Sequence, residues 1–270
     1  MLNSIGFFAE GNANVLFDRT PPFTASGVTC LLRVAKRKIS HSICTKDVFN
    51  FHQTIPKLLG EEYVLSSWLV PISRKELEDL AQVYATSSTT TRKSELDLSE
   101  NYAILVEKIV PIFEFKLKWT CQSPTAPKNA TLCRTCAVAQ MRGKIQVACP
   151  LDLASNDLTR IRNALDKMGL EPTVTTVVTN TLYCHPLLRK VHELEVSNYT
   201  SLAMKMVLRD MTYFVVVEDS TPSLLVTDYD PKHETKIEYW NEIERRLVDE
   251  GWYTVTKNSN CSVNLHIEPP

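Results

Sequence analysis

Glycine is scarce in this chain, with only 7 among 270 residues, so Gly11 within a polar turn stands out. No apolar stretch approaches the roughly 20 residues needed to span a bilayer. The first residues lack the basic region followed by an apolar run that marks a secretory signal. We therefore expect an intracellular, soluble protein with no membrane partner. The Asn-x-Ser/Thr motifs at Asn129, Asn198 and Asn260 then carry no argument for glycosylation.

Neither sign of charge is in excess, because 30 Lys and Arg oppose 31 Asp and Glu, for a net charge of −1. This balance excludes a generally basic nucleic-acid-binding protein and a protein with a polyanionic tail. We expect no direct nucleic-acid partner, and any anionic ligand must be met by a local cluster of cations. With 44% apolar residues, the chain can build a core in one large domain or two small lobes.

Three carboxylates flank a predicted β-hairpin in the second half of the chain. Residues 211–217 are β-branched and aromatic, residues 219–222 have turn chemistry, and residues 223–226 are apolar again. Asp210 would stand at the entrance of this hairpin, with Asp228 and Asp230 at its exit. Phosphotransferases of the protein-kinase shape use one Asp as base and another to hold magnesium. The alternative is a set of ordinary solvated acids.

The chain lacks the H-R-D-x-x-x-x-N and D-F-G motifs, which disfavours a generic protein kinase. Residues 4–16 predict strand, turn and strand, and a Gly and Asn turn can approach nucleotide phosphates closely. The alternative is a turn that only reverses the chain. Residues 28–35 predict a third strand, in which Arg33 either binds an anion or faces outward.

The remaining pattern predicts a mixture of helices and strands. Helical spacing covers residues 45–59, 73–83 with a capping box at Ser73 and Glu76, 185–195, 198–208 and 234–249. Ser155 is predicted to cap a helix that ends at Gly169. Strands are predicted at residues 62–71, 102–106, 110–115 and 173–178, with period-two charges over residues 114–119. We place a lobe boundary near Glu107 and expect residues from 257 onward to be frayed.

Eight cysteines in an intracellular chain are more typical of free thiols or metal ligands than of disulfides. Cys133 and Cys136 have the C-x-x-C spacing of half a zinc site, and Cys149 follows thirteen residues later. The candidates for a fourth ligand are Cys121, Cys184 and His185. Buried reduced thiols are the alternative.

Several segments resemble one family, the inositol-pentakisphosphate 2-kinases, and its fungal branch in particular. The segments are AEGNANVLF, LLRVAK, FEFKLKWTCQSPTAP, CRTC, CPLDLAS, LRDMTYF and TDYDPKHETKIEYW. The resemblance implies an α+β, two-lobed, protein-kinase-like inositol phosphate kinase fold. Residues 1–107 would form a β-rich N-terminal lobe that covers the nucleotide, and residues 108–270 a mixed C-terminal lobe with the inositol phosphate site and the catalytic hairpin.

The activity implied by the resemblance is transfer of the ATP γ-phosphate to the 2-hydroxyl of inositol 1,3,4,5,6-pentakisphosphate, which gives the hexakisphosphate, phytate. ATP and Mg²⁺ are the implied cofactors. The resemblance also implies a nuclear protein linked to messenger RNA export, with the cytoplasm left open as a second compartment, and we expect a monomer. Two alternatives are an inositol polyphosphate kinase of other positional specificity and a non-catalytic inositol-phosphate-binding scaffold.

The resemblance also assigns roles to residues. Asp210 would be the catalytic base, and Asp228 and Asp230 the magnesium ligands. The implied nucleotide contacts are Gly11, Asn12, Ala13, Asn14, Arg33, Glu107, Lys116 and Asp228. Five phosphates carry a charge of about −8, which needs clustered cations. The implied substrate contacts are Lys38, Arg92, Lys118, Arg134, Arg142, Asn180, Lys232 and Lys236.

Overall fold

The protein is described here by a computed structural model, which covers residues 4–37, 43–87, 95–144, 146–254 and 261. The chain forms two compact units. The first comprises Met1–Leu58 and Val64–Val110, and the second comprises Leu59–Tyr63 and Pro111–Pro270. Helices and two separate antiparallel sheets confirm the α+β class. The lobe boundary at Glu107 stays a prediction.

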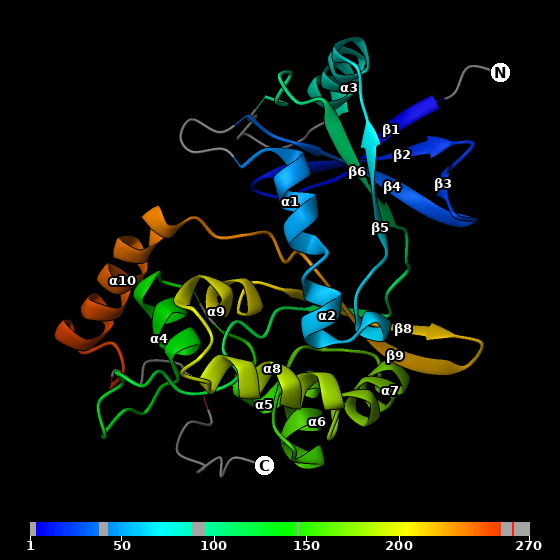
Figure 1. Ribbon diagram of the computed structural model, residues 1–270. Helices are drawn as coiled ribbons and strands as arrows, with labels where there is room; N and C mark the ends of the chain where they lie inside the picture. The colour runs from blue at the N-terminus through cyan, green and yellow to red at the C-terminus, as the bar shows by residue number, and fades with distance from the viewer. Residues whose placement is uncertain (1–3, 38–42, 88–94, 145, 255–260, 262–270) are drawn as a thin grey trace. The chain divides into compact units, whose positions relative to one another are not determined.

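The first unit contains an antiparallel sheet in the order β1-β2-β4-β6-β5, with β3 paired to β4 (Figure 1). Its strands are β1 (Ser4–Glu10), β2 (Asn14–Thr20), β3 (Phe23–Ala25), β4 (Val28–Ala35), β5 (Ser67–Pro71) and β6 (Tyr102–Glu107). The predicted strands at residues 4–16 and 28–35 are confirmed. The strand predicted at 62–71 begins only at Ser67, because Glu61–Tyr63 forms a 3-10 turn, η1.

The helix predicted over residues 45–59 is two helices, α1 (Thr45–His52) and α2 (Ile55–Leu59). The break precedes Pro56, whose ring and missing N–H are incompatible with a helix interior. Helix α3 (Arg74–Ser87) begins at the predicted capping box. The Glu76 carboxylate accepts hydrogen bonds from Ser73 N and Oγ at 2.8 and 2.6 Å, and Glu76 N donates to Ser73 Oγ at 3.3 Å.

Helix α3 covers the sheet of the first unit and packs against β1. Its buried residues Leu77, Leu80 and Tyr84 join Val15 and Phe17 of β2 in one apolar core. The period-two burial of β2 matches a strand with one face on that core. This packing holds the β1–β2 turn, residues 11–13, at the edge of the sheet.

The second unit contains the predicted hairpin, β8 (Thr212–Glu218) and β9 (Thr221–Thr227), with β7 (Phe113–Phe115) paired to β8. Its turn is tighter than predicted, since Thr221 and Pro222 already pair with β8. Asp219 and Ser220 form the two-residue turn with φ of 47° and 65°. Two positive φ values are those of a type I′ turn, which suits a twisted hairpin.

Strand β7 ends at Phe115, so the prediction that one strand face carries Glu114, Lys116 and Lys118 is wrong. Burial still alternates as far as Trp119. Lys118 has a φ of 62°, which bends the chain away from an extended course. The charged residues after β7 are therefore placed by a loop.

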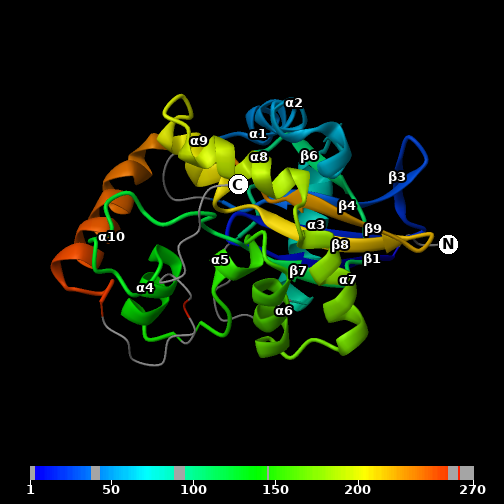
Figure 2. The same cartoon turned by 90° about the horizontal axis from the view of Figure 1, so that it is seen from below.

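Among the helices of the second unit, α7 packs against β9, and α6 and α7 lie side by side (Figure 2). They are α4 (Arg134–Met141), α5 (Pro150–Leu153), α6 (Leu158–Lys167), α7 (Pro172–Leu182), α8 (Pro186–Val196), α9 (Leu202–Leu208) and α10 (Ile237–Asp249), which follows the 3-10 turn η2 (Glu234–Lys236). Helix α10 contacts α4, and Leu247 and Tyr253 are buried beside Leu132 and Ala137.

Two local predictions in this unit are wrong. Residues 173–178 lie in α7 and not in a strand, because Glu171 caps the backbone N–H groups of Thr173 and Val174 and Pro172 begins the helix. Helix α6 is capped by Asp157, whereas the Ser155 hydroxyl donates to the carbonyl of Asp152. The helices predicted at 185–195 and 198–208 correspond to α8 and α9.

Within the described part of the chain, no helix is both long and apolar enough to cross a membrane. Most of the tail predicted to be frayed lies outside the described residues, although Cys261 is described.

Candidate functional site

A cavity of about 480 Å³ in the second unit gathers cations. Among the described residues that line it, eight are Lys or Arg, and Asp210 is the only acid. The cations are Lys116, Lys118, Arg134, Arg142, Lys144, Arg209, Lys232 and Lys236. Trp119, Tyr239, Trp240 and Ile243 add apolar surface. Such a lining selects a compact ligand with several negative charges.

Asp210 is paired with two of the predicted substrate cations. Lys118 Nζ lies 2.6 Å from Asp210 Oδ1, and Lys232 Nζ lies 2.5 Å from Oδ2. Lys116 Nζ donates to the backbone carbonyl of Asp210 at 2.9 Å and also to the Asp228 carboxylate. The pKa of Asp210 is lowered, because these two ion pairs outweigh the opposing effect of partial burial. Asp210 is therefore held as a carboxylate.

The hairpin explains why Asp210 and Asp228 lie at the same end of the sheet. Thr212 pairs with Thr227, so Asp210 enters and Asp228 leaves the hairpin at that end. Asp228 has a φ of 62°. A positive φ is uncommon outside glycine and costs roughly 1–3 kcal/mol. Its occurrence at both Lys118 and Asp228 favours a functional constraint on these two loops.

Asp228 and Asp230 offer carboxylate oxygens, the ligand type that Mg²⁺ prefers. Asp228 is exposed and Asp230 is half-buried two residues later. The Asp228 carboxylate forms an ion pair with the Lys116 ammonium. This donor set fits a divalent cation such as Mg²⁺.

Arg134 and Arg142 begin and follow helix α4, so both reach the cavity from one helix. Arg134 Nε lies 2.6 Å from Glu244 Oε2 of α10, and Arg142 Nη2 donates to the Tyr239 hydroxyl at 3.3 Å. Lys236 is exposed at the start of α10. Lys232 precedes η2 and reaches the cavity from the loop between the hairpin and the last helix.

One predicted substrate residue, Asn180, does not line this cavity. Asn180 is exposed on α7 and is not among the described lining residues, and its predicted strand end does not exist. Lys38 and Arg92 lie outside the described residues. Arg209 and Lys144 also line the cavity and were not predicted from the sequence, although Arg209 directly precedes the predicted base.

The predicted nucleotide residues of the first unit lie in the β1–β2 turn, on β4 and at the end of β6. Asn14 pairs with Ala35 and Glu107 pairs with Cys30, so Glu107 lies at the end of β4 remote from the turn. Gly11 N donates to Asn14 O at 2.9 Å, which closes the turn around Asn12 and Ala13. Arg33 is half-buried on β4, and Glu107 ends β6, where its carboxylate accepts from Ser66 N at 3.2 Å. Lys116 and Asp228 belong to the second unit.

Lys36, the last residue of the LLRVAK segment, fixes this turn. It is 4% exposed, its ammonium donates to Gly11 O at 2.8 Å, and its backbone N–H donates to Ala13 O at 2.8 Å. Glu10 lies 3.7 Å away and itself accepts from Tyr84 of α3 at 2.5 Å. A buried lysine with these partners makes the turn rigid.

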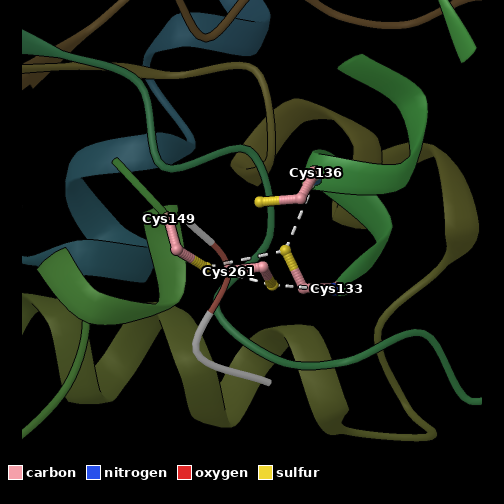
Figure 3. A group of neighbouring side chains, drawn as sticks. All are labelled: Cys133, Cys136, Cys149 and Cys261. Atoms are coloured by element: carbon pink, nitrogen blue, oxygen red, sulfur yellow. Dashed lines mark hydrogen bonds between the residues drawn. The ribbon is translucent and has the colours of Figure 1, made fainter. Parts of the chain in front are cut away.

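Four cysteines converge beside helix α4 (Figure 3). The ligand atoms of Cys133, Cys136, Cys149 and Cys261 all lie within 4.8 Å of one another. Cys149 Sγ is 3.7 Å from both Cys133 Sγ and Cys261 Sγ, so these are not disulfides. The first three are the predicted group. The fourth is Cys261, whereas the candidates Cys121, Cys184 and His185 are not in this group.

The sulfur spacing fits a tetrahedral metal site. Zinc binds thiolates at about 2.3 Å, which sets the sulfur–sulfur edge of a tetrahedron at about 3.8 Å. The two sulfur–sulfur distances of 3.7 Å match that edge. Cys133, Cys136 and Cys149 are buried, and Cys261 is partly buried, so the group is closed as in structural sites.

Comparison with known proteins gives a family and one curated relative. The family model for inositol-pentakisphosphate 2-kinase matches residues 7–182. A Yarrowia lipolytica protein named inositol-pentakisphosphate 2-kinase is 31% identical over 163 residues. This alignment covers 55% of each chain, so the chain spans about half the length of the curated relative that it matches. Asp210, Asp228 and Lys232 lie beyond the residues that the family model matches.

Proposed function

The chain belongs to the inositol-pentakisphosphate 2-kinase family, and we propose that it transfers the γ-phosphoryl group of ATP to the 2-hydroxyl of inositol 1,3,4,5,6-pentakisphosphate. The observation that carries this proposal is the cavity in which, among the described lining residues, eight cations surround one acid, Asp210. A ligand with about −8 charges matches this lining, and no other acid among the described lining residues repels it.

In the proposed reaction, the Asp210 carboxylate accepts the proton of the 2-hydroxyl as that oxygen bonds to the γ-phosphorus. The bond from the γ-phosphorus to the bridging oxygen breaks, and ADP leaves. Lys118 and Lys232 orient the inositol phosphates, and Lys116 neutralises charge on the transferred group. A lowered pKa is compatible with this role, because a loose phosphoryl-transfer transition state needs positioning more than strong base chemistry.

Asp228 and Asp230 would hold magnesium, which when bound neutralises the nucleotide phosphates. The β1–β2 turn, residues 11–13, would cover the nucleotide, with Arg33 and Glu107 as further contacts. With this assignment we also propose that the protein has a two-lobed, kinase-like fold. We extend the proposal to a monomer that works in the nucleus, where its product would support messenger RNA export. Light scattering and localisation of a tagged chain test these two points.

One product assay tests the activity and separates the alternatives. The protein is incubated with magnesium, γ-labelled ATP and a panel of inositol polyphosphates, and the product isomer is identified. We expect the hexakisphosphate from the 1,3,4,5,6-pentakisphosphate. Transfer to another hydroxyl would instead establish a kinase of different positional specificity. Tight binding without transfer to any member of the panel would leave a scaffold as the function.

We also propose that Cys133, Cys136, Cys149 and Cys261 hold a structural zinc ion. The closed set of four thiolates supports zinc over a group of reduced thiols, because its spacing fits a tetrahedral ion. The ion would join the start of α4 to the segment after α10. Elemental analysis of the purified protein should find one zinc per chain. A metal-free protein of undiminished stability would contradict the proposal.

A further inference from the structure

Helix α8 ends in a buried carboxylate that the proposed chemistry does not use. Glu195 is 2% exposed, and both of its oxygens are occupied. Oε2 accepts from Thr120 N at 2.9 Å and from Thr120 Oγ1 at 2.5 Å, and Oε1 accepts from Arg209 Nε at 2.7 Å. A glutamate is rarely buried this completely unless it is paired, and here it joins two distant segments.

Those two segments carry the reacting groups. Thr120 follows Lys118 by two residues, and Arg209 directly precedes Asp210. The ladder between β7 and β8 ends at the pair Phe115 and Tyr213. Beyond this pair, no strand pairing fixes Lys118 opposite Asp210. Glu195 supplies a connection at the point where the ladder stops.

Arg209 is also held from its other side. Its guanidinium lies 3.2 Å from the centroid of the Trp119 ring, and Arg134 lies over the same ring at 4.7 Å. Trp119 stands between Lys118 and Thr120 in the chain. The carboxylate of Glu195 and the ring of Trp119 therefore fix Arg209 to the loop that carries Lys118.

We propose that Glu195 is a positioning residue for phosphoryl transfer, which holds Thr120 and Arg209 so that Lys118 and Asp210 face the same bound inositol phosphate. This inference rests on the proposed function. A buried ion pair of this kind is weak evidence for stability, since an apolar replacement is often as stable. A geometric role better explains why Glu195 is buried and paired, because Glu195 joins the two loops that carry Lys118 and Asp210.

The test compares Glu195→Gln with Glu193→Gln, an exposed residue of the same helix. A misplacement of about 1 Å can reduce a rate about 10²-fold. We expect kcat to fall by about that factor in Glu195→Gln, with less than threefold change in the KM for ATP or in the Kd for inositol hexakisphosphate. The control should match the wild type. Circular dichroism and the bound fraction of hexakisphosphate normalise kcat to folded protein.

A second pair of variants covers the case in which Glu195→Gln does not fold. Thr120→Val removes one hydrogen bond and Thr120→Ser keeps it, so only the valine variant should lose kcat. Normal kcat in Glu195→Gln, or equal loss in both Thr120 variants, would overturn the positioning role while the wild type remains active. A wild type that transfers no phosphate would overturn the proposed function and this inference together.

Discussion

Replacing Asp210 by Asn should abolish turnover and, at the same time, tighten the binding of inositol phosphates. In the protein without ligand, the Asp210 carboxylate pairs with Lys118 and Lys232. A polyanion that binds in the cavity must compete for these lysines and approach the Asp210 charge. Asparagine keeps the shape of the side chain and removes the charge, so both lysines become available.

The magnitude follows from the exposure of the two pairs. The side chains of Asp210 and Lys118 are 41% and 42% exposed, so solvent screening limits their pair to about 0.5 kcal/mol. Lys232 is only 15% exposed, which favours about 1 kcal/mol for its pair. The sum of about 1.5 kcal/mol corresponds to roughly a tenfold lower Kd.

Isothermal titration calorimetry with inositol hexakisphosphate at about 0.15 M salt measures this Kd without turnover. Asp219→Asn is the matched control, because Asp219 carries the same charge at the opposite end of the hairpin. Its φ of 47° suits asparagine. An unchanged or raised Kd in Asp210→Asn, with the control unaffected, would refute the idea that the lysines exchange from Asp210 to the ligand.

Three further changes test other parts of the site. Lys232→Ala should raise the KM for the inositol phosphate about 10–100-fold, because a hydrogen bond to a charged group is lost, and it should raise the KM for ATP less. Steady-state kinetics that show the opposite pattern would contradict the assignment. In Gly11→Ala the added Cβ would lie 4.0 Å from Asn14 O, so the melting temperature should hold while the KM for ATP rises several-fold; an unchanged KM would argue against a nucleotide-covering turn. Cys261→Ser should lower both the zinc content and the melting temperature, whereas Cys44→Ser, at an exposed thiol, should change neither; normal zinc content in Cys261→Ser would exclude it as a ligand.

The hairpin and the β1–β2 turn could be predicted because their signals are local. β-Branched and aromatic residues before Asp219 and Ser220, and apolar residues after them, specify strand, turn and strand within a few residues. The same logic failed at residues 173–178, where β-branched residues lie in α7. Helix α7 begins at a cap from Glu171 and packs against α6 and β9, and these contacts override weak strand propensity.

The missed site residues depend on contacts that are distant in sequence. Cys261 meets Cys149 across 112 residues, and it stands in a polar tail with no periodicity. Arg209 gains its role from Glu195 and from Trp119, and neither residue carries a motif that points to the other. The C-x-x-C pair and the acids at the hairpin ends were visible because spacing alone indicates them.

The cations of the cavity differ in how firmly they are held. Arg134 and Arg209 pair with Glu244 and Glu195, whose side chains are 17% and 1% exposed. The Glu244 carboxylate also accepts hydrogen bonds from Ser123, Thr125 and Tyr253. Removing either partner would leave a buried charge unpaired, so these two arginines keep their carboxylates and form the wall of the cavity.

The lysines of the cavity are held less firmly, because the carboxylates that pair with them are exposed. Asp210 and Asp228 side chains are 41% and 47% exposed, and exposed pairs contribute little and exchange readily. Lys116, Lys118 and Lys232 can therefore leave these acids when phosphate oxygens arrive. As they leave, the effect that lowers the pKa of Asp210 weakens, so its carboxylate becomes a stronger base when substrate is bound. The same lysines would thus neutralise the ligand and strengthen Asp210 as the acceptor of the hydroxyl proton.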